Sequence, residues 1–263
     1  EMCIRDRGSF LDARSHEGEW RLRIDDIDPP RHDKVSFGSI PRCLESHGLT
    51  WDGPIIFQSQ RREAHEEALS KLRNAGNLFD CLCTRATLGE LGACVSDCRN
   101  RQDIEGSLRF HLPSAAPDRV EDLFLGEQHA SAIPSNFIVK RRDGLIAYQL
   151  ATAIDDLDEG YTHVIRGADL LESSLRQMML HQTFGRLSPE YGHLPIVTDQ
   201  SGNKLSKQTG AQAIDSDTPN ANLRRALAFL GQPTPPQDVD CVEDILQLAT
   251  VNWRRDSLNL KTL

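Results

Sequence analysis

The sequence predicts an α/β nucleotide-binding domain followed by a short helical tail. Segments with strand and helix patterns alternate up to Lys207, whereas only helical patterns follow after about Thr218. A chain of 263 residues is long enough for one large domain with a small appendage. Its 38% hydrophobic and 26% charged residues are typical of a globular protein rather than of a disordered one.

The first predicted strand ends in a run of acidic residues. Residues 20–24 (WRLRI) alternate apolar and polar side chains, and 25–30 (DDIDPP) then adds three carboxylates and two prolines. Because proline cannot continue a ladder, the carboxylates lie at or just past the carboxyl end of the strand. Ligands of open α/β sheets bind at that edge, so we expect these carboxylates near a ligand.

Helical patterns follow this strand. One runs from Ser59, its predicted N-cap, to Ala75 and ends at Gly76. Another runs from Leu170 to Phe184. The other predicted elements are a strand at 137–139 before a turn at 142–144, and a helix at 242–253 with Asp240 and Glu243 as its capping box.

Four of the seven cysteines lie in one short stretch of the chain. Cys81 and Cys83 form one close pair, Cys94 and Cys98 form another, and ten residues lie between the pairs. Two close pairs of thiolates can make the closed tetrahedral site of a structural zinc ion. The spacing departs from the commoner C-x2-C knuckle, so a set of buried free thiols stays open as the alternative. We expect residues 79–101 to be a small insertion that carries this site.

Charge and hydropathy limit the class of protein. A net charge of −9 and a pI of about 5.5 argue against a general nucleic-acid coat protein, although a local RNA-binding patch stays open. No apolar run approaches the ~20 residues that span a bilayer, and the charged start shows no signal peptide. We therefore expect a cytoplasmic protein without a membrane segment, and a monomer.

A lysine-rich loop is the first candidate for phosphate chemistry. Residues 202–208 (GNKLSKQ) place Lys204 and Lys207 on either side of a serine. Two ammonium groups on a polar loop suit the triphosphate of ATP, where negative charge shifts during attack at phosphorus. Taken alone, so short a motif is better explained as an ordinary basic surface loop.

The loop is one of several motifs in a consistent order. Residues 204–207 (KLSK) resemble the KMSKS signature of class I aminoacyl-tRNA synthetases, and 23–31 (RIDDIDPPR) resemble their glutamate-specific segment RIEDIDPPR. Residues 142–151 (RDGLIAYQLA) and 165–170 (IRGADL) look like their substrate-pocket segments. Together these motifs resemble the family of glutamyl-Q tRNA(Asp) synthetases, short relatives of glutamyl-tRNA synthetase. The resemblance covers nearly all of 8–253.

The resemblance implies a fold and an activity. The fold would be a Rossmann-type class I synthetase catalytic domain over 8–217, with the zinc-bearing insertion at 79–101 and a helical tail at 218–263. Such an enzyme, a ligase, uses ATP and Mg²⁺ to convert glutamate to glutamyl-adenylate. It then transfers the glutamyl group to the queuosine base in the anticodon loop of tRNA(Asp).

The resemblance also implies roles for single residues. Asp25 would face the ammonium group of glutamate, although the family has Glu here and the shorter Asp would need a bridging water. Tyr148 would offer its hydroxyl to the substrate, and Arg166 would hold a substrate carboxylate. Lys207 would contact ATP, and Lys204 would support the same loop. Judged singly, a turn, a core tyrosine and a surface ion pair explain Asp25, Tyr148 and Arg166 as well; the ordered set favours the functional roles.

The family carries a zinc site in the region of the cysteines, which favours metal over free thiols. Its third ligand is often a tyrosine, and Cys94 stands in that place. The family also begins with a strand and a glycine-containing turn that resemble RFAPSPSGxLHFGS and hold its ATP-binding HIGH-type histidines and an arginine that contacts glutamate. Recognisable sequence here starts at Gly8, so the resemblance implies that this HIGH-type motif is lost. We therefore expect an N-terminally truncated or misassembled form, poorly stable and weakly active.

Two other interpretations stay open. One is a fragment of a true glutamyl-tRNA synthetase, which would charge the terminal adenosine of tRNA(Glu). The other is a non-catalytic, zinc-stabilised RNA-binding module that kept the scaffold and lost the ATP chemistry. Glutamate activation without tRNA would separate the short enzyme from both.

Overall fold

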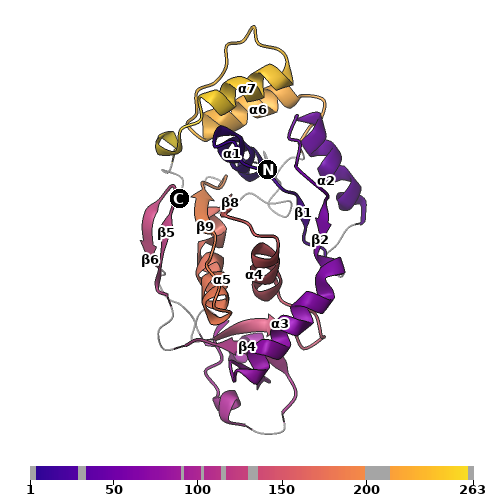
Figure 1. The fold of residues 1–263 in the computed structure, drawn as a ribbon, viewed down its shortest axis with the longest axis vertical. Coiled ribbons are helices and arrows are strands. Elements are labelled where there is room, and N and C mark those ends of the chain that lie inside the picture. The colour runs from indigo at the N-terminus through magenta and orange to yellow at the C-terminus, as the bar shows by residue number, and fades with distance from the viewer. Residues whose placement is uncertain are drawn as a thin grey trace.

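The structure is a computed structural model in which small sheets are covered by helices. The helices α6 and α7 lie at one end of the long axis, and the sheet strand β4 lies near the other end (Figure 1). Among the described residues no helix is both long and apolar enough to cross a membrane. The structure describes residues 4–28, 34–89, 92–101, 104–113, 117–129, 136–198 and 214–259, of which 34–37 without their side chains.

The largest described sheet has four strands in the order β6-β5-β9-β8. β5 pairs in parallel with β9, and β9 with β8, whereas β6 is antiparallel to β5. The helix α5 connects β8 to β9, so that the carboxyl ends of these two strands lie at one edge, with Arg166 opposite His193. The bounds are β5 Arg119–Asp122, β6 Gly126–His129, β8 His163–Gly167, α5 Leu171–Thr183 and β9 Glu190–Leu194.

A second sheet, antiparallel throughout, carries the cysteine segment. Its strands lie in the order β3-β4-β7, and the cysteine segment connects β3 to β4. The helices α3 and α4 pack on it around a core that includes Leu72, Phe110 and Leu150. The bounds are α3 Arg62–Asn74, β3 Leu78–Cys81, β4 Ser107–His111, β7 Asn136–Lys140 and α4 Tyr148–Asp158.

The first part of the chain contributes a separate two-stranded parallel sheet. β1 (Arg23–Ile24) pairs with β2 (Ile56–Phe57), and the helix α2 (Lys34–Ser46) lies between them in sequence. The strand predicted at 20–24 is thus shorter than expected. Before β1 the Trp20 N–H donates to the carboxylate of Asp52 at 2.7 Å, and the Trp20 carbonyl accepts from the Asp52 N–H at 2.8 Å, so this part of the segment bonds a turn rather than a strand.

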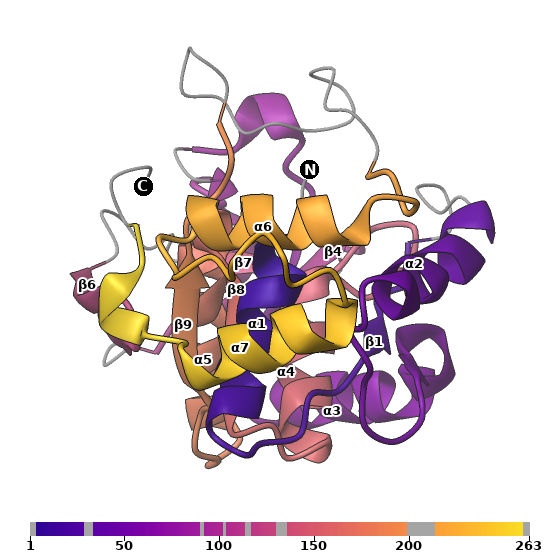
Figure 2. The ribbon, with the colours of Figure 1, turned by 90° about the horizontal axis from the view of Figure 1, so that it is seen from above.

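The C-terminal helices share one core with the first helix of the chain. α1 (Ile4–Ser15) packs against α6 (Pro219–Phe229) and α7 (Val242–Val251), as Figures 1 and 2 show from two sides. The carboxylate of Asp12 on α1 accepts hydrogen bonds from the Trp253 indole at 2.9 Å and from two guanidinium nitrogens of Arg255 at 2.8 Å. The predicted helical tail is therefore fixed to the beginning of the chain by a buried carboxylate.

The predicted helices are confirmed, but two predicted caps are wrong. Ser59 lies before α3, and its N–H and hydroxyl donate to the carboxylate of Asp26 at 2.7 and 2.6 Å. Before α7 the N-cap residue is Cys241, without a capping hydrogen bond, and its thiol donates to Glu243 instead. In both places a group expected to cap the helix bonds another side chain instead: the Ser59 hydroxyl bonds Asp26, and the Glu243 carboxylate bonds the Cys241 thiol.

Candidate functional site

The four clustered cysteines meet in space. Their sulfur atoms all lie within 4.8 Å of one another, and Cys83 Sγ lies 3.6 Å from Cys94 Sγ and 3.8 Å from Cys98 Sγ. A tetrahedral zinc ion with Zn–S bonds of about 2.3 Å separates its sulfurs by about 3.8 Å. The four thiols are free rather than disulfide-bonded. The arrangement therefore fits a structural zinc ion, and every ligand position is taken by the protein.

Residues outside the cluster hold one of its ligands in place. The side chain of Asn136 accepts from the Cys94 N–H at 2.9 Å and donates to the Cys94 carbonyl at 3.3 Å. The same Asn136 oxygen accepts from Nε of Arg109 at 2.6 Å, and Arg109 also donates to the Gly92 carbonyl. Arg109 is 2% exposed, so its positive charge is buried beside the thiols. A buried cation there offsets the negative charge of metal-bound thiolates.

The thiols themselves differ in acidity. Hydrogen bonding from the Ser96 side chain is the main cause that lowers the pKa of Cys83 to about 6, while burial raises the pKa of Cys81 to about 12. Burial also raises the pKa of Cys94. A metal ion would have to displace protons from Cys81 and Cys94, because the thiolate is the ligand, whereas Cys83 is already largely a thiolate at neutral pH.

A buried arginine forms the second part of the candidate site. Arg166, near the end of β8, is 5% exposed and donates to Ser174 Oγ at 2.5 Å and to the Tyr148 hydroxyl at 3.4 Å. Its guanidinium lies over the ring of Tyr191, 5.0 Å from the centroid. Within the part of the chain that the structure describes, Arg166 Nε and the Tyr191 hydroxyl are buried without a hydrogen-bond partner. Two buried polar groups in this state favour a polar ligand at this position.

Asp25 reaches the same region through two other charged residues. Arg23 donates to Asp25 at 2.9 Å and to the buried Asp156 at 2.5 Å. Burial raises the pKa of Asp156; the positive charge of Arg166 lowers this pKa, and the negative charge of Asp25 raises it. The structure thus brings Tyr148 and Arg166 into contact, and it connects Asp25 to them through Arg23 and Asp156.

The two lysines predicted to contact ATP, Lys204 and Lys207, lie outside the described residues, which stop at 198 and resume at 214. Their roles stay predictions.

We call Arg166 and the residues around it, Arg23, Tyr148, Asp156, Ser174 and Tyr191, the arginine pocket. Sequence reasoning missed several of these residues. Arg23 stood inside the family-like segment without a role, and Ser174 gave no signal at all. Asp155 and Asp156 gave a signal that was overlooked. Two carboxylates inside an apolar helix pattern need buried partners, so their presence indicates a polar site. Asp155 has three of them: Gln58 at 2.8 Å, Arg61 at 3.0 Å and His65 at 2.9 Å.

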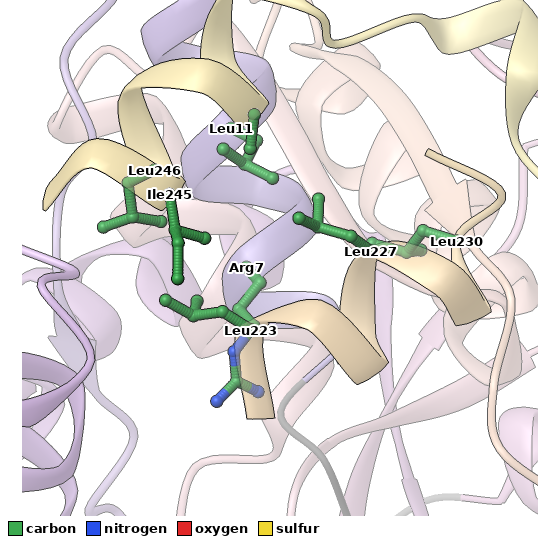
Figure 3. Close-up of a pocket in the computed structure, with 8 residues that line it drawn as sticks. Arg7, Leu11, Leu223, Leu227, Leu230, Ile245 and Leu246 are labelled. Carbon is green, nitrogen blue, oxygen red and sulfur yellow. The ribbon is translucent and has the colours of Figure 1, made fainter. Parts of the chain in front are cut away.

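An enclosed hollow elsewhere in the molecule is not part of this site. It lies between α1, α6 and α7, where Leu11, Leu227 and Ile245 surround it (Figure 3). Packing leaves it no room for a water-sized molecule. With a lining that is apolar apart from Arg7 and no such room, it is a packing imperfection rather than a ligand site.

Solved structures show the same fold. The chain superposes on a glutamate tRNA ligase from Elizabethkingia meningosepticum with a TM-score of 0.75 at 21% identity, over 97% of this chain and 62% of that one. A glutamate-tRNA synthetase from Elizabethkingia anophelis gives the same score, with 63% of its chain covered. This chain thus spans less than two thirds of either protein, and the likeness confirms the α/β class I synthetase fold.

Sequence comparisons identify the family. The family of class I tRNA synthetases for E and Q, catalytic domain, matches residues 8–93 and 91–243. The glutamyl-Q tRNA(Asp) synthetase of Shewanella amazonensis is 42% identical over 94% of this chain and 85% of its own length. That of Escherichia coli K12 is also 42% identical, over 94% of this chain and 82% of its own. The chain therefore belongs to the glutamyl-Q tRNA(Asp) synthetases, a family of ligase-type, aminoacyl-tRNA synthetase-like enzymes that use ATP and Mg²⁺.

Proposed function

We propose that this chain activates glutamate with ATP and transfers it to the queuosine base of tRNA(Asp). The buried Arg166 with an unpartnered Nε is the observation that carries the first half of the proposal. A guanidinium in a buried site binds a carboxylate strongly, because its planar fork can donate to both oxygens. The names of the relatives support the second half, the choice of the queuosine-bearing tRNA(Asp).

In the first step the α-carboxylate of glutamate attacks the α-phosphorus of ATP, and the bond to the bridging oxygen breaks. Pyrophosphate leaves and glutamyl-adenylate forms. Because the α-carboxylate reacts, the carboxylate that Arg166 holds would be that of the glutamate side chain. Tyr148 would donate its hydroxyl to the same group, and Asp25 would pair with the ammonium. Mg²⁺ would neutralise charge on the phosphates.

In the second step a hydroxyl of queuosine attacks the activated carbonyl, and AMP leaves. The chain's contribution to both steps would be positioning and charge stabilisation rather than a covalent protein nucleophile. Lys204 and Lys207 would stabilise the departing pyrophosphate. A zinc ion at Cys81, Cys83, Cys94 and Cys98 would be structural, because four protein ligands leave no open position.

Glutamate-dependent exchange of pyrophosphate into ATP without tRNA tests the first half. Relative to the rate of the wild-type chain, we expect Arg166→Lys to lower exchange roughly a hundredfold, since an ammonium cannot replace a positioned fork. Arg119→Lys is the matched control, because Arg119 on β5 is exposed and pairs with Glu127 at 3.2 Å. Equal exchange by Arg166→Lys and wild type would contradict the role of Arg166.

Transfer of labelled glutamate tests the second half. We expect transfer to tRNA(Asp) that carries queuosine and none to the same tRNA with guanosine at that position. Charging of tRNA(Glu) at its terminal adenosine would instead support the activity of a full glutamyl-tRNA synthetase. RNA binding without exchange would support the non-catalytic module.

A further inference from the structure

Three buried side chains connect the middle of the four-stranded sheet to Arg166. On β9, His193 lies between Asp122 at the end of β5 and Ser174 on α5; these elements lie side by side in Figure 1. His193 Nδ1 is 2.5 Å from Asp122 Oδ2, and His193 Nε2 is 2.9 Å from Ser174 Oγ. Ser174 Oγ is in turn 2.5 Å from Arg166 Nη2. We propose that these three side chains position the Arg166 guanidinium for the substrate carboxylate, an inference that rests on the function proposed above.

The donors fix the direction of this relay. An arginine can only donate, so Ser174 Oγ accepts from Arg166 and offers its own hydrogen elsewhere. The nearer acceptor is His193 Nε2 at 2.9 Å, because the Leu170 carbonyl is 3.4 Å away. A histidine that accepts at Nε2 is neutral and carries its proton on Nδ1, which then donates to Asp122. Each member thus donates to the next, from Arg166 to Asp122.

Asp122 is a fixed anchor at the end of the relay. Its Oδ1 accepts the backbone N–H groups of Phe124 and Leu125 at 3.0 Å and of His193 at 3.2 Å. This leaves Oδ2 for the imidazole. Burial alone would raise the pKa of Asp122, but the hydrogen bonds from His193 and Phe124 outweigh burial and lower it. The anchor therefore stays ionised and keeps the histidine in one tautomer.

The same three residue types form the nucleophilic triad of many hydrolases, but that role does not fit here. Ser174 is fully buried, and its oxygen already accepts from Arg166. A nucleophile needs an open approach for its substrate and a base free to take its proton. The relay can therefore hold a side chain, whereas it cannot present one for attack.

A comparison with Arg23 shows what the relay achieves. Arg23 pairs directly with Asp25 and Asp156, so its charge is already neutralised by carboxylates. The hydrogen-bond partners of Arg166 among the described residues are neutral hydroxyls; Asp122 lies two side chains away, and Asp156 acts on the Arg166 charge only through space. Because Coulomb attraction falls with distance, this leaves more of the Arg166 charge for a ligand. The relay orients Arg166 without competing for it.

Titration calorimetry on the full chain tests the relay, with L-glutamate and ATP measured separately. Ser174→Ala removes the acceptor of Arg166, and we expect the glutamate Kd to rise roughly ten- to a hundredfold, as for other supporting contacts of a site. The ATP Kd should stay unchanged, and the preference for glutamate over glutamine should fall. Ser174→Thr keeps a hydroxyl and should stay close to wild type. Ser70→Ala is the control, because Ser70 on α3 is exposed and bonds the Glu66 carbonyl of its own helix.

The outcomes separate the relay from the function on which it rests. A glutamate Kd unchanged in Ser174→Ala but raised in Arg166→Met overturns the relay alone, as does a parallel loss of ATP affinity. An unchanged Kd in Arg166→Met, or no glutamate binding by the wild type, overturns the proposed role of Arg166 and the relay with it. If Ser174→Ala does not fold, His193→Gln removes the contact with Asp122, and a weakened glutamate Kd with unchanged ATP Kd is again the expected result.

Discussion

The cysteine cluster and the arginine pocket differ in how far the chain itself satisfies them. In the cluster, four sulfurs lie within 4.8 Å of one another, and Asn136 holds the backbone of Cys94 from both sides. In the pocket, the structure shows Arg166 Nε, Tyr191 Oη and Asp156 Oδ2 buried without a hydrogen-bond partner among the described residues. One site is complete apart from an ion, whereas the other has polar groups left over.

The difference follows from what each site binds. A structural metal needs only thiolates in the right geometry, and one stretch of chain between 81 and 98 supplies them all. A substrate with several charged groups needs matching partners from separate strands and helices. Each buried polar atom without a partner destabilises the folded chain by about 1–3 kcal/mol, and a ligand that bonds to it removes that cost.

Removal of one cysteine should give the largest effect and tests whether the cluster is a metal site. In Cys98→Ser, a hydroxyl replaces a buried thiolate ligand, and we expect zinc affinity to fall by more than about a hundredfold, beyond the cost of losing an outer contact. Competition with a chromogenic chelator measures this. Cys241→Ser is the matched control, since Cys241 is exposed and lies outside the cluster. Equal zinc affinity in both variants would favour the buried free thiols.

The support from Asn136 should have a smaller effect on the same equilibrium. Asn136→Ala removes both hydrogen bonds to the backbone of Cys94 and leaves Arg109 Nε without its acceptor. We expect a loss of about ten- to a hundredfold in zinc affinity, with the four ligands intact. Asn100→Ala is the control, because the Asn100 side chain bonds the exposed Asp97 instead. If both variants bind zinc as tightly as wild type, the cluster needs no support from outside.

The sequence predicted the cluster better than the pocket because the cluster is local. The spacing of Cys81, Cys83, Cys94 and Cys98 was enough to propose that they meet, and in the structure they do. Tyr148 and Arg166 were selected only by resemblance to a family, and the structure shows them in contact with each other. Their binding of glutamate stays a prediction.

Long-range partners account for what the sequence did not predict. His193 bonds Asp122, which lies 71 positions earlier, and no periodic pattern relates the two. The wrong cap at Ser59 has the same cause, since its hydroxyl binds Asp26, 33 positions away. Local rules assign a polar side chain to its nearest backbone partner, and a distant carboxylate can compete with that partner.

The smallest expected effect is the change in folding stability with pH that comes from His181, which lies on the same helix as Ser174. His181 lies on α5, the helix that carries Ser174, and is fully buried between the Ala153 carbonyl and the Ser188 hydroxyl, each at 3.1 Å. Burial lowers the pKa of His181 to about 4 from 6.5. The unfolded chain therefore binds this proton first, so stability that is present above pH 6.5 is lost as the pH falls toward 4. Between pH 7.5 and 6 the loss should be roughly 0.5–1 kcal/mol.

Urea unfolding at pH 7.5 and pH 6 measures the free energy of unfolding of the wild-type chain and of His181→Gln, and the loss is the difference between their changes with pH. In His181→Gln the amide can still donate to the Ala153 carbonyl but cannot take up a proton, so its free energy of unfolding should change less between pH 7.5 and 6 than that of wild type. His163→Gln is the control, because His163 on β8 is exposed and its substitution should leave the wild-type pH dependence in place. An identical pH dependence in wild type and His181→Gln would mean that His181 titrates alike in the folded and unfolded chains. The interior around α5 would then tolerate a charged imidazole despite its full burial.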